Sequence, residues 1–73
     1  MPKTIHTKKY REVIGRLRAA RIDFGLTQKQ VSQKLNLSQS YISKVEAGEQ
    51  RIDILELTEL ANIYKKNINF FLE

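Results

Sequence analysis

Apolar residues recur at helical spacing in the first third of the chain. Between residues 10 and 24 they fall at Val13, Leu17, Ala20 and Phe24, at spacings of four, three and four. This period places them on one face of an α-helix, and Gly25 suits the left-handed position that ends such a helix. The pattern predicts a first helix over residues 10–24, preceded by a flexible basic arm over residues 1–9.

Capping signals then predict two short helices. Thr27, with Gln30 three residues later, forms a capping box that opens a helix over residues 28–35. Asn36 tolerates the left-handed conformation needed after this helix. Ser38 opens a third helix over residues 39–47, which Gly48 ends.

The last part of the chain repeats these signals. Asp53 and Glu56 form a further capping pair and predict a fourth helix over residues 54–65. A short final turn carries Phe70, Phe71 and Leu72. The chain therefore predicts an all-α, compact five-helix domain over residues 10–73, with a core that includes Leu57, Leu60, Ala61 and Tyr64.

The two short helices of residues 28–47 are joined by three residues and must cross steeply. Such a crossing needs a small residue where the backbones approach, and Ser32 supplies it. Apolar residues face the body of the domain at Val31, Leu35, Leu37, Ile42 and Val45. Hydrogen-bonding side chains, of which only one is charged, are left on the outer face of the third helix, at Gln39, Ser40, Ser43 and Lys44.

Charge and composition narrow the function classes. Residues 1–30 hold eight Lys or Arg against two Asp or Glu, whereas residues 52–73 hold two against four. A basic N-terminal part and an acidic C-terminal part are typical of a protein that binds a polyanion on one side. The chain has no Cys and a single His, His6, so we expect no metal site, and no run of apolar residues is long enough to span a membrane. We find no phosphate loop and no catalytic constellation, and we expect a cytoplasmic protein that is not an enzyme and takes no cofactor or small-molecule ligand.

The run GLTQKQVSQKLNLSQSYISKVEAGEQ resembles the helix-turn-helix of the lambda-repressor/Cro, or Xre, family of bacterial and phage regulators. The resemblance extends from about Val13 to Leu72 and implies a lambda-repressor-like domain that binds double-stranded DNA in a sequence-specific manner. Phage-type repressor, restriction–modification controller and antitoxin all stay open as roles. The chain departs from the family pattern at Asn36, where Gly is usual, and at Lys65 and Lys66, where Gly and an apolar residue are common.

The resemblance also implies roles for single residues. Gln39 and Ser40 match positions that contact bases, and Lys44 matches a position that faces either bases or the DNA backbone. The amide of Gln39 has the geometry to bind adenine through two hydrogen bonds. Gln28 matches a residue that contacts phosphate and props Gln39. Backbone contacts are expected, from the resemblance or from charge, at Thr27, Gln28, Ser43, Lys9, Lys29 and Arg51. Arg21 and Glu46 match a structural salt bridge between the first and third helices.

A regulator of this kind is expected to act as a homodimer on a pseudo-palindromic operator. Apolar residues near the fourth helix and the C-terminal turn predict the dimer interface, at Ile52, Ile54, Phe70, Phe71 and Leu72. The alternative is a protein–protein adaptor that uses the same fold, with the C-terminal turn as its binding surface. Tyr41 is left open between a contact with the DNA backbone and a role in covering the helix.

Overall fold

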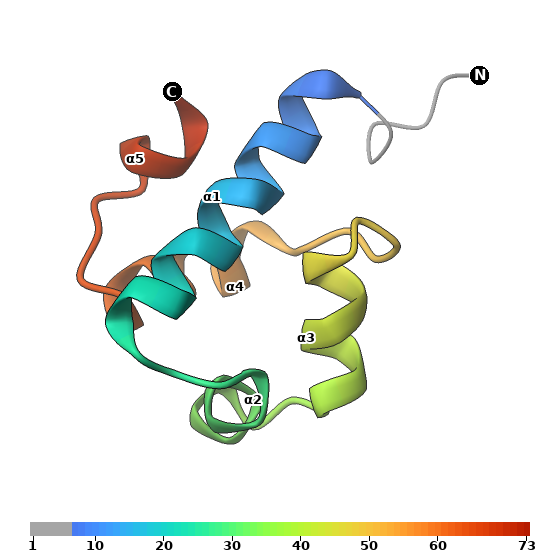
Figure 1. The fold of residues 1–73 in the computed structure, drawn as a ribbon, viewed down its shortest axis with the longest axis vertical. Helices are drawn as coiled ribbons and strands as arrows, with labels where there is room; N and C mark the ends of the chain where they lie inside the picture. The colour runs from blue at the N-terminus through green and yellow to red at the C-terminus, as the bar shows by residue number, and fades with distance from the viewer. Residues whose placement is uncertain (1–6) are drawn as a thin grey trace.

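Every predicted helix is present in the computed structural model, which describes residues 7–73 (Figure 1). The helices are α1 (Lys8–Phe24), α2 (Gln28–Leu35), α3 (Gln39–Glu46), α4 (Ile54–Ile63) and α5 (Asn69–Leu72). Strands are absent from this part of the chain, so the all-α prediction is confirmed. None of these helices is long and apolar enough to cross a membrane.

The first helix begins two residues earlier than predicted. The hydroxyl of Thr7 accepts a hydrogen bond from the backbone N–H of Tyr10 at 3.1 Å, which makes Thr7 the N-cap. Lys8 and Lys9 therefore belong to α1 and not to an arm. The rest of the predicted arm, residues 1–6, lies outside the described residues.

Four helices end in the same way. After each of α1 to α4, one residue adopts a left-handed conformation: Gly25 (φ 85°), Asn36 (φ 56°), Gly48 (φ 77°) and Lys65 (φ 60°). The N–H of each binds the carbonyl three residues back, and the N–H of the next residue binds the carbonyl five residues back, which is the Schellman arrangement. The helix of α4 thus stops at Ile63, two residues before the predicted end, because Lys65 takes the turn position.

The core is formed mainly by the predicted residues. Buried apolar side chains come from all five helices: Val13, Ile14, Leu17, Ala20, Val31, Ile42, Val45, Leu57, Leu60, Ala61, Tyr64 and Phe71. The apolar face predicted for the first helix is core at Val13, Leu17 and Ala20 but not at Phe24, which is 44% exposed. In the last turn of α1 the buried position belongs instead to Arg21, whose guanidinium pairs with Glu46.

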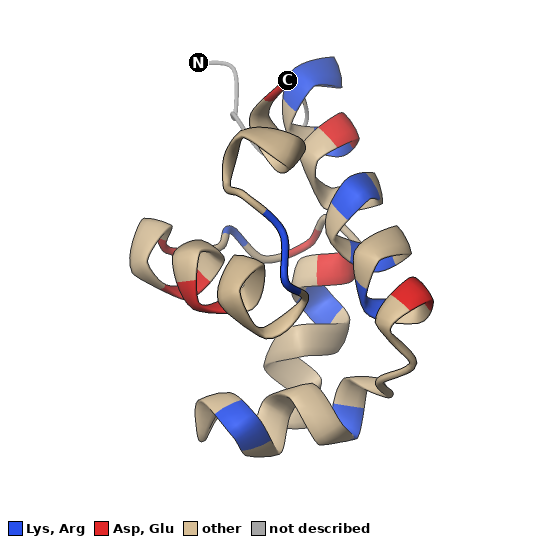
Figure 2. Ribbon diagram, turned by 90° about the vertical axis from the view of Figure 1, so that its left-hand side faces the viewer, with Lys and Arg blue, Asp and Glu red and all other residues tan. Residues whose placement is uncertain are grey.

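The close backbone approaches are those of α2 with α3, α1 with α3 and α1 with α5. Figure 1 shows α2 and α3 at one end of the molecule, and α5 with the start of α1 at the other. In Figure 2 the acidic residues of α4 lie on the opposite side of the molecule from α1, which carries many of the basic residues. The fold therefore places α2 and α3 together at one end of the molecule.

Candidate nucleic-acid interface

The chain enters α2 and α3 through strong local caps. Thr27 Oγ1 accepts from the N–H of Gln30 at 3.1 Å, and Gln30 Oε1 accepts from the N–H of Thr27 at 2.9 Å. Ser38 Oγ accepts from the N–H of Tyr41 at 3.0 Å and so opens α3. Asn36 takes the left-handed turn between the helices, as predicted. These caps fix where each helix starts, and therefore which side chains face outward.

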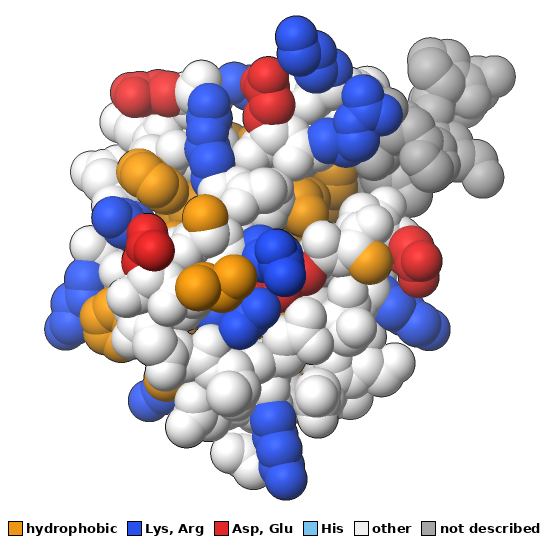
Figure 3. Space-filling view, in the orientation of Figure 1, with side chains coloured by type: hydrophobic (Ala, Val, Ile, Leu, Met, Phe, Trp, Pro, Cys, Tyr) orange, Lys and Arg blue, Asp and Glu red, His pale blue; other side chains and the backbone are white. Residues whose placement is uncertain are grey.

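The inner faces of the two helices are closed by the predicted apolar residues. Val31, Ile42 and Val45 are buried, and Leu35 and Leu37 pack against the same core. The turn of the helix then directs a set of polar side chains to solvent, all of them exposed: Gln39, Ser40, Ser43 and Lys44. In Figure 3 the surface over α2 and α3 is mostly neither charged nor apolar. The structure thus presents these four residues on one hydrogen-bonding surface.

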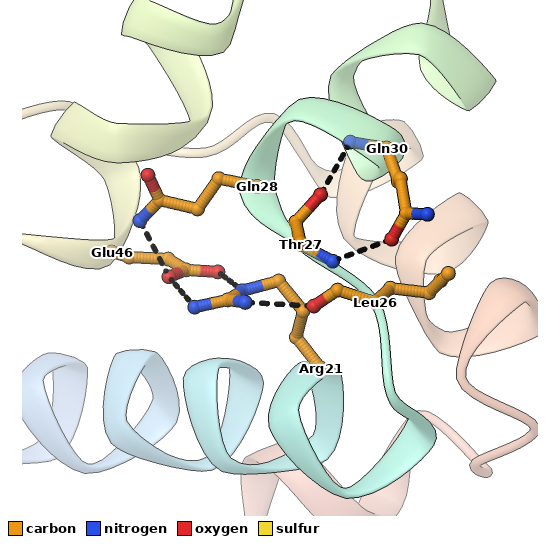
Figure 4. A network of polar contacts seen from close by, with 6 residues as sticks. All are labelled: Arg21, Leu26, Thr27, Gln28, Gln30 and Glu46. Carbon is orange, nitrogen blue, oxygen red and sulfur yellow. Dashed lines mark hydrogen bonds and ion pairs between the residues drawn. The ribbon is translucent and has the colours of Figure 1, made fainter.

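A buried ion pair holds this helix pair to α1 (Figure 4). Arg21 Nε donates to Glu46 Oε2 at 2.7 Å, and Arg21 Nη2 donates to Glu46 Oε1 at 3.0 Å. The remaining guanidinium nitrogen, Nη1, donates to the carbonyl oxygen of Leu26 at 2.8 Å. The hydrogen bonds that Arg21 donates to Glu46 raise the pKa of Arg21 above its ordinary value. The predicted pairing is therefore present, and it joins α1, α3 and the entry to α2.

Gln28 takes part in this network. Its Nε2 donates to Glu46 Oε1 at 3.0 Å, and the side chain is half-buried. The expected prop is not seen: among the described residues no hydrogen bond joins Gln28 to Gln39. The physical reason is that a carboxylate only accepts hydrogen bonds, so Glu46 attracts the amide nitrogen of Gln28 toward the ion pair.

The predicted backbone contacts fall into two groups. Thr27 and Lys29 are exposed at the start of α2, and Arg51 is exposed in the loop after α3. Lys9 is far from them: Figure 1 places the start of α1 beside α5, at the other end of the molecule from α2. There the Nζ of Lys9 donates to the carbonyl oxygen of Glu73 at 3.4 Å. Lys9 therefore lies apart from the other residues predicted to contact the DNA backbone. The reason is that Thr7 caps α1, which places Lys9 in the first turn of this helix.

Two tyrosines attach the loop between α3 and α4. Tyr41, half-buried on α3, donates its hydroxyl hydrogen to Glu56 Oε1 on α4. Burial, and then the hydrogen bond to Glu56, raises the pKa of Tyr41 to about 12. Tyr10 Oη accepts from the N–H of Ile52 at 2.9 Å. Of the two roles that the sequence left open, Tyr41 has the one within the protein: its ring is half-buried and its hydroxyl is hydrogen-bonded to α4.

The apolar residues predicted for a dimer interface are not equally accessible. Ile54, Phe70 and Leu72 are 62%, 42% and 43% exposed, and Ile52 is partly buried. Phe71 is fully buried and cannot supply an interface, which corrects that prediction. Its burial is held by α5 docking on α1, where Arg16 Nη1 donates to the carbonyl oxygen of Phe71 at 3.2 Å.

One exposed apolar residue was not among those predicted for the interface. Leu55 is 70% exposed, more than any other large apolar side chain in the described part of the chain. It follows Ile54 in the first turn of α4. The signal for it was present in the sequence, because a core face made of Leu57, Leu60, Ala61 and Tyr64 leaves residue 55 outside.

Within residues 7–73, no group of three or more His, Cys, Asp or Glu side chains is placed to hold a metal ion. What these residues offer instead is an uncharged hydrogen-bonding helix face with basic residues beside it.

Comparison with known proteins agrees with this geometry. A helix-turn-helix family model matches residues 17–71 of the chain. The matched region runs from the middle of α1 into α5 and includes α2, α3 and both members of the buried ion pair. Among curated proteins, none matches the chain.

Proposed function

Since the chain belongs to the lambda-repressor-like (Xre) helix-turn-helix family of DNA-binding transcription regulators, we propose that it acts as a homodimer on a pseudo-palindromic operator. In this proposal α3 enters the major groove and α2 lies across the phosphate backbone. The biological role falls among phage-type repressors, restriction–modification controllers and antitoxins that bind DNA.

The observation that carries the proposal is the outer face of α3. Four exposed side chains lie there, three of them uncharged hydrogen-bonding groups: Gln39, Ser40, Ser43 and Lys44. A face that served only solubility would usually hold more Glu and Lys. The amide of Gln39 can donate to N7 and accept from N6 of adenine, a pairing that distinguishes this base in the major groove. Ser40 and Lys44 extend the same face toward neighbouring bases.

The backbone contacts follow from the start of α2. Thr27 and Lys29 are exposed at this end, where the partial positive charge of a helix N-terminus favours a phosphate. Ser43 and Arg51 reach a phosphate from α3 and from the loop after it. Lys9 is left out of this set, because it lies at the opposite end of the molecule. Gln28 has a structural role: its hydrogen bond to Glu46 holds the start of α2 against the end of α3.

The dimer part of the proposal rests on exposed apolar side chains at two places in the fold, Ile54 and Leu55 in the first turn of α4 and Phe70 and Leu72 in α5. One recognition helix reads only a few base pairs, whereas two related by a two-fold axis read half-sites about 34–36 Å apart. An isologous interface requires a patch that faces its own copy.

Selection of bound sites from random duplex DNA tests the reading surface, using wild type, Gln39→Ala and Lys29→Ala. Gln39→Ala should lose discrimination at one base position in each half-site, at a cost of about 1–3 kcal/mol. Lys29→Ala is the matched control, because a lost phosphate contact should weaken all duplexes alike. If Gln39→Ala ranked the sites as wild type does, Gln39 would not be the reading residue.

Salt dependence separates this function from a protein–protein adaptor. Each phosphate neutralised contributes a slope of about −0.9 to log K against log salt. With Lys29 and Arg51 in each of two subunits, we expect a slope corresponding to several ions. A flat response to salt on duplex DNA would favour the adaptor, with Phe70 and Leu72 as its surface.

A further inference from the structure

A side-chain hydrogen bond joins α3, the proposed recognition helix, to the exposed first turn of α4. The side chain of Tyr41 leaves α3 on the side away from its outer face, and its hydroxyl donates to Glu56 Oε1. In the described part of the chain, this is the side-chain hydrogen bond that joins α3 to α4. The backbone of α3 packs mainly against α1 and α2, so this hydrogen bond is the direct polar contact between α3 and α4.

Glu56 is itself part of the cap of α4. The same Oε1 atom accepts from the N–H of Asp53 at 3.4 Å, and Asp53 Oδ1 accepts from the N–H of Leu55 at 2.7 Å. Ile54 and Leu55 stand between these two capping residues, with 62% and 70% of their surface exposed. One carboxylate oxygen therefore connects the recognition helix to the turn that carries the exposed apolar pair.

We propose that Tyr41 is a positioning residue that sets the angle between the recognition helix and the dimer surface, and so determines which spacing between half-sites the dimer accepts. This rests on the proposed function, in which Ile54 and Leu55 meet a second copy. If the first turn of α4 is fixed at the two-fold axis, a small rotation of α3 relative to it moves both recognition helices in opposite directions. The hydrogen bond between Tyr41 and Glu56 opposes that rotation.

Tyr10, on α1, provides a matched control because its hydroxyl contacts the loop between α3 and α4. Its Oη accepts from the N–H of Ile52 at 2.9 Å, so it attaches the loop to α1 rather than to α3. Tyr10→Phe and Tyr41→Phe each remove one phenol hydroxyl and keep the ring. Tyr41→Phe releases α3 from Glu56 on α4 and from the carbonyl oxygen of Arg51, which the Tyr41 hydroxyl also contacts at 3.4 Å. Tyr10→Phe leaves both of these contacts in place.

The experiment is selection of bound sites from random duplex DNA by wild type and both variants, with melting temperatures measured in parallel. Wild type should select two inverted half-sites at one preferred spacing. Tyr41→Phe should select the same half-sites, while its preference for that spacing over one base pair more or fewer falls about tenfold, the order expected for a hydrogen bond to a charged group. Tyr10→Phe should keep the wild-type spacing even where its melting temperature falls.

Glu56 tests the same bond from the other side. The amide oxygen of Glu56→Gln still accepts from Tyr41, so this variant should keep the preferred spacing, whereas Glu56→Ala should lose it. This pair decides the matter if Tyr41→Phe does not fold. If substitutions at both Tyr41 and Glu56 leave the preferred spacing unchanged, the role proposed for Tyr41 is overturned, while the proposed dimer is not. A wild type that selects single half-sites, or no sequence, overturns the dimer as well as this role for Tyr41.

Discussion

The left-handed position after each of α1 to α4 is filled by three different residue types, with different energetic consequences. Gly25 and Gly48 have no Cβ and adopt positive φ without steric cost. Asn36 adopts it with little cost, whereas Lys65 brings its Cβ close to the following carbonyl oxygen. The same backbone turn is therefore strained at one of its four occurrences.

Replacing Lys65 with Gly should relieve this strain. We expect Lys65→Gly to raise the free energy of unfolding by about 0.5–1 kcal/mol, after allowing for the greater freedom of Gly in the unfolded chain. Lys66→Gly is the matched control: it also removes a lysine, but its φ is not positive, and it loses the Lys66 Nζ that lies 4.6 Å from the ring centroid of Phe70. Chemical denaturation of both variants measures the difference. A Lys65→Gly variant no more stable than wild type would contradict this account.

At the scale of elements, boundaries could be predicted where their signals are local. The bounds of α2 agree with prediction, because Thr27 and Asn36 each act within a few residues. The end of α4 was placed two residues late, because Lys65 carries no stop signal of its own. The contacts of Gln28 with Glu46 and of Tyr41 with Glu56 join separate helices, and no local pattern encodes the distance between them.

In the candidate site, too, features that depend on local sequence could be predicted and those that depend on packing between helices could not. The outer face of α3 followed from its helical period, and its four polar residues are exposed as predicted. The burial of Phe71 and the exposure of Phe70 could not be separated, since the two lie side by side in a four-residue helix. Their placement depends on how α5 docks on α1, which is a property of the packed molecule.

The tie between α1 and α3 should dominate the stability of the helix pair. The side chains of Arg21 and Glu46 are only 11% and 6% exposed. Removing one partner leaves an unpaired buried charge, so Arg21→Ala should destabilise the fold by about 3–5 kcal/mol. Arg18→Ala, on the exposed side of α1, should change stability by less than about 0.5 kcal/mol.

A double variant separates the ion pair from simple packing. Arg21→Met with Glu46→Met removes both charges, so it should recover much of the loss caused by Arg21→Ala. Thermal unfolding of the four proteins gives the comparison. An Arg21→Ala protein that melts with wild type would show that the pair contributes little.

At the scale of the whole molecule, the functional unit depends on the exposed surface around the start of α4. Leu55→Glu places a charge in the proposed interface, and the fold should tolerate it because an acidic residue is favourable in the first turn of a helix. Wild type should sediment as a dimer at tens of micromolar, and Leu55→Glu as a monomer. Ile22→Glu, at a 51% exposed apolar position on α1, is the control and should remain a dimer.

Binding to DNA completes this test. The Leu55→Glu monomer should keep weak affinity for one half-site and lose the preference for paired half-sites. A wild type that stays monomeric at this concentration, even in the presence of its selected site, would contradict the dimer.

The shared helix ending has a consequence for how quickly the chain folds. Because each Schellman turn is closed by hydrogen bonds spanning at most five residues, α1 to α4 can set their lengths before any helix meets another. Proteins built from such local contacts fold rapidly, and the entropy of closing a loop then limits the rate. The buried pair of Arg21 and Glu46 closes a loop of 25 residues that contains the whole of α2. Docking of α3 on α1 is thus the expected rate-limiting event, and a slower folding rate should accompany any insertion between α1 and α3.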